Sequence, residues 1–198
     1  MTRQLVIATK NKKKLHELSR YLKDVDAEVL SLDSFNKSPV VREDGDTFKK
    51  NAVKKAVKIS KFVKGLAIAD DSGLVVDHLG GDPGVRSARF AGPGKNDVDN
   101  SKKVLSLLKD VPLKKRTARF VCAVAIASNG KVVKVMEESC KGLIAFEMKG
   151  SRGFGYDPIF LIPKYKKTFG QLGLKVKDRM SHRSKVLKKA RAFLKKYL

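Results

Sequence analysis

The chain has 198 residues, a length typical of one compact domain or of two closely packed lobes. Hydrophobic residues make up 42% of the sequence, enough for a substantial core, yet no apolar run approaches the roughly 20 residues that span a bilayer. The formal charge of +24 comes mainly from lysine, and with only 7% aromatic residues this composition does not fit a base-reading or single-strand-binding surface, which favours arginine and exposed aromatic side chains.

The first half of the chain predicts strands that alternate with amphipathic helices. Asn11 can cap a helix over 12–22, because Leu15, Leu18 and Leu22 recur at helical spacing. The other elements expected here are strands over Gln4–Ala8, Ala27–Leu32, Leu66–Asp70 and Leu74–Val76, and a helix that Asp46 or Thr47 caps and that ends near Val63.

The second half of the chain predicts a long hairpin and a terminal helix. Asn129-Gly130 is a strong two-residue turn signal between the β-like runs Arg116–Ala127 and Lys131–Ser139. Because helices and strands interleave and no linker divides the sequence, we expect an α/β fold with a mixed sheet in a single domain over 1–198. The remaining expected elements are a helix over Asp97–Leu108, a glycine-rich turn over Ser151–Asp157, a strand over Ile159–Ile162 and a last helix capped by Ser181.

The two cysteines predict free thiols. If Ser128 pairs with Lys131 across the turn, Cys122 and Cys140 lie three positions out of register and on opposite faces, which does not suit a disulfide. Their spacing matches no metal motif. The start of the chain, Met1-Thr2-Arg3-Gln4, leads directly into an apolar strand without a signal-peptide core, so we expect a cytoplasmic protein.

The most informative stretch is Ala69-Asp70-Asp71-Ser72-Gly73, which follows an apolar run. It predicts two carboxylates where a strand meets a loop, a place where binding and catalytic groups tend to lie. Adjacent residues of an extended chain point to opposite faces, so only one of the two acids can face a given site. A plain strand-end turn is the alternative interpretation, since Asp and Gly dominate turns.

Two clusters could hold phosphate and metal. The segment Thr9–Lys14 would direct helix N–H groups and lysines at one point, as phosphate sites do, or it is simply a capped helix followed by solvated lysines. Glu43, in the acidic segment Glu43–Asp46, could join Asp71 around Mg²⁺, which takes one or two carboxylates. The alternative for that segment is an ordinary acidic helix N-terminus.

Two later clusters could hold a base. The turn Gly153–Pro158 presents Phe154 between glycines, where the ring could stack on a nucleobase or plug the core under a loop. In Ser181-His182-Arg183, the histidine and the arginine can donate hydrogen bonds to a carbonyl oxygen or a phosphate. An isolated pair of this kind at a helix start is more often plain surface.

Together and in this order, the clusters resemble the inosine triphosphate pyrophosphatase family, whose members are also called XTP/dITP diphosphatases. The resemblance runs from the first strand to the last helix. The matching residues are Thr9-Lys10-Asn11 with Lys14, Glu43 with Asn51 and Lys55, Ala69–Leu74, Leu79-Gly80-Gly81 with Pro83-Gly84, Ser87-Ala88-Arg89-Phe90, Gly153–Pro158 and Ser181-His182-Arg183.

The resemblance implies an α/β protein with an elongated mixed β-sheet, flanking helices and two lobes around a central cleft, usually as a homodimer. It implies a hydrolase of nucleotide metabolism that converts ITP, dITP and XTP to the monophosphate and pyrophosphate with Mg²⁺ as cofactor. Such an enzyme removes non-standard purine nucleotides from the pool and needs neither a membrane nor a specific nucleic acid.

The resemblance also assigns residue roles by position. Asp71 is the proton acceptor for the attacking water and a magnesium ligand, with Glu43 beside it. The implied substrate-binding residues are Thr9, Lys10, Asn11, Lys12, Lys13, Lys14, Lys55, Ser72, Phe154, Gly155, Tyr156, Asp157, Lys177, His182 and Arg183.

The sequence departs from the family pattern at a few positions, and two alternatives stay open. Arg86 stands where an aromatic residue is expected, Lys10 and Lys13 replace the commoner glycines, and the high lysine content is not a family trait. One alternative is a diphosphatase for another modified nucleotide. The other is a lysine-rich nucleic-acid-binding protein, whose binding would weaken steeply with salt.

Overall fold

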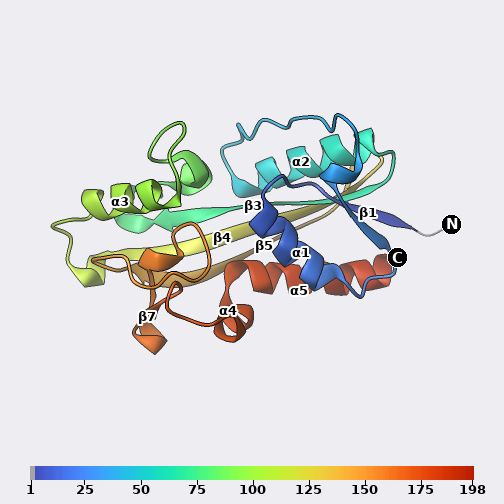
Figure 1. The fold of residues 1–198 in the computed structure, drawn as a ribbon. Coiled ribbons are helices and arrows are strands. Elements are labelled where there is room, and N and C mark those ends of the chain that lie inside the picture. Colours follow the sequence, from blue (N-terminus) through green and yellow to red (C-terminus); the bar gives the residue numbers. More distant parts are fainter. Residues whose placement is uncertain (1–2) are drawn as a thin grey trace. The chain divides into compact units, whose positions relative to one another are not determined.

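The computed structural model describes residues 3–198; Met1 and Thr2, on which part of the localisation prediction rests, lie outside the described residues. Its elements alternate as the sequence predicts (Figure 1). The strands are β1 Gln4–Ile7, β2 Glu28–Ser31, β3 Leu66–Val76, β4 Thr117–Ser128, β5 Lys131–Ile144, β6 Phe160–Ile162 and β7 Lys167–Thr168. The α-helices are α1 Lys12–Leu22, α2 Phe48–Phe62, α3 Asp97–Leu107, α4 Leu174–Met180 and α5 His182–Tyr197.

The described strands form one mixed sheet, which confirms the predicted α/β class. Their order is β2-β1-β3-β4-β5-β6-β7. The strand β1 pairs in parallel with β2 and β3, whereas β6 pairs antiparallel with β5 and β7. The chain divides into two compact units, of which the first comprises 1–71, 122–138 and 186–198 and the second comprises 72–121 and 139–185. The predicted cleft and the single-domain assignment stay predictions.

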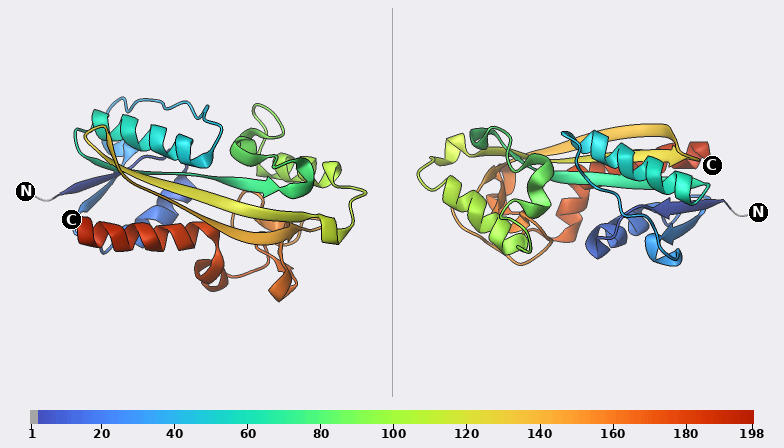
Figure 2. Two further views of the ribbon diagram at one scale, coloured as in Figure 1. Left: turned by 180° about the vertical axis from the view of Figure 1, so that it is seen from behind. Right: turned by 90° about the horizontal axis from the view of Figure 1, so that it is seen from above.

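In the first unit, helices cover both faces of the sheet. Helices α1 and α5 lie on one face and α2 lies on the other (Figures 1 and 2). Leucines of α1 and α5 share one core with the apolar side chains of β1, β3 and β4. Asn11 caps α1 through Oδ1, and Thr47, rather than Asp46, caps α2. The first turns of both helices contact β3, through Lys14 with Asp70 and through Asn51 with Asp71.

The expected break between Asp70 and Leu74 is wrong, because β3 runs without interruption from Leu66 to Val76. Asp and Gly in this stretch therefore do not form a turn. Every residue of the strand is buried except Ser72, which is half-buried. A strand buried on both faces reads as a continuous apolar run, and here that run contains two carboxylates that the surrounding helices must compensate.

The second unit is built on its own core. Side chains of β3, α3, β4 and the turn after Tyr156 pack together in it. Asn96 and Asp99 form a capping box at the start of α3, and the Ser181 hydroxyl accepts from Ser184 N at 3.1 Å at the start of α5. The short helix α4 was not predicted. Both cysteines are free and buried, as predicted.

No helix within residues 3–198 has the length and apolar character needed to cross a membrane.

Candidate active site

The two aspartates of β3 face opposite sides of the sheet, as their adjacency predicts. Asp70 is fully buried and meets Lys14 of α1, with Nζ 3.1 Å from Oδ2. Asp71 is also buried and its Oδ2 accepts a hydrogen bond from Asn51 Nδ2 of α2 at 3.0 Å. Lys14 therefore compensates the negative charge of buried Asp70, and Asp70 does not form a turn. Asp71 belongs to the face that α2 covers.

Lys55 lies one turn beyond Asn51 on α2, and several carboxylates act on its ammonium. Its ammonium forms an ion pair with the carboxylate of Glu43, which comes from the loop before α2. Burial opposes the charge of Lys55, but Asp70, Glu43 and Asp71 outweigh it and raise the pKa of the ammonium. Three carboxylates thus act on one buried cation.

The carboxyl of Asp71 has a raised pKa. Burial is the main cause, and the negative charge of Glu43 adds to it. Lys55 and Lys14 oppose the shift by attraction, and Asn51 opposes it by donating to the carboxylate. The result is a buried carboxylate of increased basicity held next to cations, an arrangement typical of functional sites.

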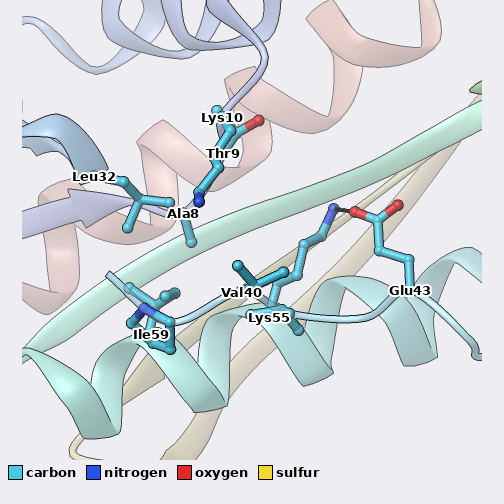
Figure 3. A pocket seen from close by; sticks show the side chains of 10 residues that line it. Ala8, Thr9, Lys10, Leu32, Val40, Glu43, Lys55 and Ile59 are labelled. Carbon is cyan, nitrogen blue, oxygen red and sulfur yellow. Dashed lines mark hydrogen bonds and ion pairs between the residues drawn. The ribbon is translucent and has the colours of Figure 1, made fainter. Parts of the chain in front are cut away.

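Glu43 and Lys55 line a cavity of about 160 Å³ within the first unit (Figure 3). Thr9 and Lys10 lie on its other side, so four of the predicted site residues meet around one space. Whole small-molecule ligands occupy sites of roughly 300 Å³ or more, so this cavity suits a phosphate group rather than an entire nucleotide. The other lining residues are Ala8, Leu32, Pro39, Val40, Val41 and Ile59.

The carboxylates of Glu43 and Asp71 fit Mg²⁺. Within residues 3–198 no cluster of three or more His, Cys, Asp or Glu side chains is arranged to hold a metal. Mg²⁺ needs only one or two carboxylates and fills its remaining positions with water and phosphate oxygens. Glu43 lies close enough to Asp71 to raise the pKa of that carboxyl, so the two oxygen donors share one neighbourhood.

The turn before α1 is ordered by its own polar groups. Asn11 Oδ1 accepts from the N–H groups of Lys13 and Lys14 at 3.0 and 3.2 Å, and Thr9 Oγ1 accepts from Asn11 N at 3.2 Å. Two helix N–H groups that a phosphate would use are therefore already capped. The side chains of Lys10, Lys12 and Lys13 in this turn are exposed.

A second cluster surrounds the ring of Phe154 in the second unit. The guanidinium carbon of Arg183 lies 5.1 Å and the ammonium of Lys177 5.3 Å from the ring centroid. Lys177 forms an ion pair with buried Asp157, whose Oδ2 also accepts from Phe154 N at 2.8 Å. Arg183 Nη2 donates to the hydroxyl of Ser72 at 2.7 Å. An aromatic face and fixed hydrogen-bond donors are what recognition of a base requires.

Three other predicted substrate-binding residues make contacts with the fold around them. Tyr156 is buried and its hydroxyl donates to Ser87 O at 2.7 Å. His182 is buried and stacks on Phe120 at a centroid distance of 4.8 Å. Gly155 donates its N–H to Asp97 Oδ2 at 2.8 Å. Tyr156 and Gly155 thereby anchor the turn that holds Phe154, whereas His182 packs against β4.

Sequence reasoning missed several supporting residues. Asn51 was noted only as part of the family pattern, although its position four residues before Lys55 puts both side chains on one helix face. Asp97 and Phe120 carried no sequence signal, because their partners lie more than fifty residues away. Arg86, which stands where the family pattern has an aromatic residue, forms an exposed ion pair with Asp82 at 2.6 Å.

Comparison with known proteins finds the same fold and close sequence relatives. The family model described as "Ham1 family" matches residues 5–193. A protein named dITP/XTP pyrophosphatase from Desulforamulus reducens is 51% identical over 191 residues, which are 96% of this chain and 95% of the relative. One of the same name from Geobacillus kaustophilus is 49% identical over 187 residues, 94% of this chain and 92% of that protein.

Solved structures agree with these relatives. The Ham1 protein of Staphylococcus aureus superimposes with a TM-score of 0.89 at 36% identity, over 99% of this chain and 100% of that one. A structure described as nucleoside-triphosphatase / dITP/XTP pyrophosphatase from Mycobacterium abscessus gives a TM-score of 0.79 at 40% identity, over 94% of this chain and 98% of that one.

Proposed function

This chain belongs to the Ham1 family, and we propose that it hydrolyses dITP, XTP and ITP to the nucleoside monophosphate and pyrophosphate. The family membership confirms the resemblance that the motifs predicted. The observation that carries the proposal is the cluster of Asp71, Glu43 and Lys55, in which both carboxylates act on the Lys55 ammonium, next to the cavity that Glu43 and Lys55 line. A buried basic carboxylate, a second carboxylate and a lysine are the groups that a hydrolysis of phosphoanhydride bonds needs.

In this proposal Asp71 accepts the proton of the attacking water. Its burial supports that role, because it raises the basicity of the carboxylate, and Asn51 restricts its rotation by holding Oδ2. The water oxygen forms a new bond to phosphorus as the P–O bond that joins the α- and β-phosphates breaks, and the products are the monophosphate and pyrophosphate. Lys55 stabilises negative charge as it develops on the phosphate oxygens.

The metal in the proposal is Mg²⁺, held by Glu43 and Asp71. When bound there, the ion would offset the charge of the triphosphate and lower the pKa of a coordinated water. Lys55, which forms an ion pair with Glu43 in this structure, also lines the cavity and can exchange that partner for a phosphate oxygen. The remaining phosphate contacts are assigned to Thr9, Lys10, Asn11, Lys12, Lys13 and Lys14.

Base recognition is assigned to the Phe154 cluster. Lys177 and Arg183 contact its ring and are donors, which suits the 6-keto acceptor of inosine and xanthosine and opposes the 6-amino donor of adenine. A site built around such a hydrogen bond can reject the wrong group by roughly 10⁴. Ser72, Gly155, Tyr156, Asp157 and His182 complete the assigned set.

Three further properties belong to the proposal. They are a homodimeric assembly, which the resemblance implies, a cytoplasmic location and the absence of a specific nucleic-acid partner.

The proposal is tested by the release of inorganic pyrophosphate from a panel of nucleotides. ITP, dITP and XTP are compared with ATP, GTP, CTP and UTP, with Mg²⁺ and at alkaline pH. We expect turnover of the three non-standard purines and at least a hundredfold lower kcat/KM for ATP. No turnover of any 6-keto purine would rule the proposal out, and preference for a modified pyrimidine would favour the alternative diphosphatase.

A further inference from the structure

Asn51 connects the strand that carries Asp71 to the loop that carries Glu43. Its side chain is fully buried on α2. Its Nδ2 donates to Asp71 Oδ2 at 3.0 Å and lies 3.4 Å from Gly45 O, and its Oδ1 accepts from Gly45 N at 2.8 Å. One amide group therefore links a catalytic candidate to the backbone two residues after Glu43.

Gly45 allows this close approach because it has no side chain. A Cβ atom added there would lie 2.8 Å from Asn51 Oδ1, closer than real Cβ contacts, and 3.0 Å from Lys50 Cβ, which is tighter than most of them. Position 45 therefore requires a residue without a side chain, because the Asn51 amide occupies the space. The loop and α2 are in close contact at this point.

Weaker contacts hold the same loop on the outer side of α2. Lys50 pairs with Asp46 at 2.9 Å, and Lys54 pairs with Asp44. Lys58 donates to Val40 O at 2.8 Å. These lysines are spaced four residues apart, so they form one row, and their exposed pairs contribute little. Asn51 and Lys55 form the neighbouring inner row, where burial makes each hydrogen bond and ion pair matter more.

We propose that Asn51 is a positioning residue that fixes the carboxylates of Asp71 and Glu43 relative to each other, an inference that rests on the proposed function. Through Nδ2 it sets the rotation of the Asp71 carboxylate, and through Gly45 it sets the position of the loop that presents Glu43. In this role it acts through Asp71 and Gly45, which are its hydrogen-bond partners. Groups of this kind, which orient ligands from behind, change metal affinity and turnover by roughly 10- to 100-fold when removed.

Two variants break the link from opposite sides. Asn51→Leu keeps the approximate volume and removes all three hydrogen bonds. Gly45→Ala leaves Asn51 in place and forces the loop away from the Asn51 amide. Because Gly45 lies in a loop, this variant still provides a test if Asn51→Leu, which changes a buried residue, fails to fold. The matched control is Asp46→Asn, which breaks an exposed pair one residue further along the same loop.

The measurements are kcat and KM for XTP with Mg²⁺, and the affinity for Mn²⁺ alone, followed by electron paramagnetic resonance without nucleotide. We expect both variants to lose about 30-fold in kcat and about tenfold in Mn²⁺ affinity. KM should stay within about threefold, because the residues that hold the nucleotide are unchanged. The control should match the wild type in all three quantities.

The inference is overturned if the wild type turns over XTP while Asn51→Leu and Gly45→Ala keep kcat and Mn²⁺ affinity within twofold. It is also overturned if the wild type does not bind Mn²⁺. A wild type that binds Mn²⁺ but turns over no nucleotide contradicts the proposed function instead, and the Mn²⁺ affinities of the variants still decide the role of Asn51.

Discussion

At Asp71, burial and charge act in opposite directions on the same carboxyl. Burial raises its pKa, and Glu43 adds to the shift, whereas Lys55 and Lys14 favour the ionised form. The carboxylate is thereby more basic than an exposed one without being isolated from cations. Proton acceptance works best when the base has a pKa near the working pH, so the direction of this shift suits the assigned role.

Among the assigned residues, Phe154 is the one whose substitution should weaken binding of the nucleotide base most directly. Replacing it with alanine removes the ring on which Lys177 and Arg183 rest and on which a base would stack. We expect KM for XTP to rise about tenfold or more, since stacking on an aromatic side chain is worth roughly 1–3 kcal/mol. The fall in kcat should be smaller.

Tyr165→Ala is the matched control, because that ring is partly exposed and lies outside the Phe154 cluster. Steady-state kinetics with XTP on both variants provides the comparison. Equal KM values for the two variants and the wild type would remove Phe154 from the base site.

At the scale of elements, local signals predicted most of the fold. The caps at Asn11 and Ser181 and the Asn129-Gly130 hairpin are confirmed, because each depends on residues that are neighbours in the chain. The wrong break after Asp70 shows the limit of such signals. Asp and Gly favour turns locally, but packing of Lys14 and Asn51 from both faces compensates two carboxylates inside a strand.

The candidate site was predictable only in part for the same reason. Its residues are spread along the chain, and no periodicity relates the turn at Phe154 to Lys177 or Arg183. A family resemblance supplied that grouping. The physical contacts that hold the groups, such as Asn51 with Gly45, appear only when the loop and α2 pack together.

Ion pairs contribute to the packing of α5 in the first unit, and their contribution can be tested by changing the pH. Asp24, in the loop after α1, accepts from Arg191 Nε at 2.7 Å and pairs with Lys195 at 2.6 Å. The hydrogen bond from Arg191, followed by that from Lys195, holds the pKa of Asp24 well below its usual value. A carboxyl whose pKa is lowered on folding stabilises the protein above its unfolded pKa and loses that contribution as the pH falls.

We therefore expect Asp24→Asn to lower the urea midpoint at pH 7 by a small, measurable amount. The gap between the variant and the wild type should narrow at pH 3, below the ordinary pKa of about 3.9 for an aspartate. Asp26→Asn, two residues away and exposed, serves as the control. A gap that stays constant or widens on acidification would show that Asp24 does not anchor α5 through its charge.

At the scale of the whole molecule, the charge of +24 invites association with polyanions of any kind. The acidic side chains are already counted in this net charge, so ion pairs such as Lys49 with Glu137 at 3.5 Å and Lys189 with Glu138 leave it unchanged. The excess positive charge favours a negatively charged substrate by long-range attraction that salt screens within about 10 Å at 0.1 M. Salt should therefore weaken non-specific binding of polyanions strongly and hydrolysis at a specific active site only slightly.

The most direct measurement of the central claim is pyrophosphate release from XTP by the wild type and by Asp71→Asn, each at 0.05 and 0.3 M KCl. The account predicts that the wild type keeps most of its kcat at the higher salt. The variant should lose at least about 10³-fold in kcat while its equilibrium affinity for XTP stays within a few-fold. Turnover by Asp71→Asn near the wild-type rate, or no pyrophosphate from the wild type at either salt concentration, would contradict it.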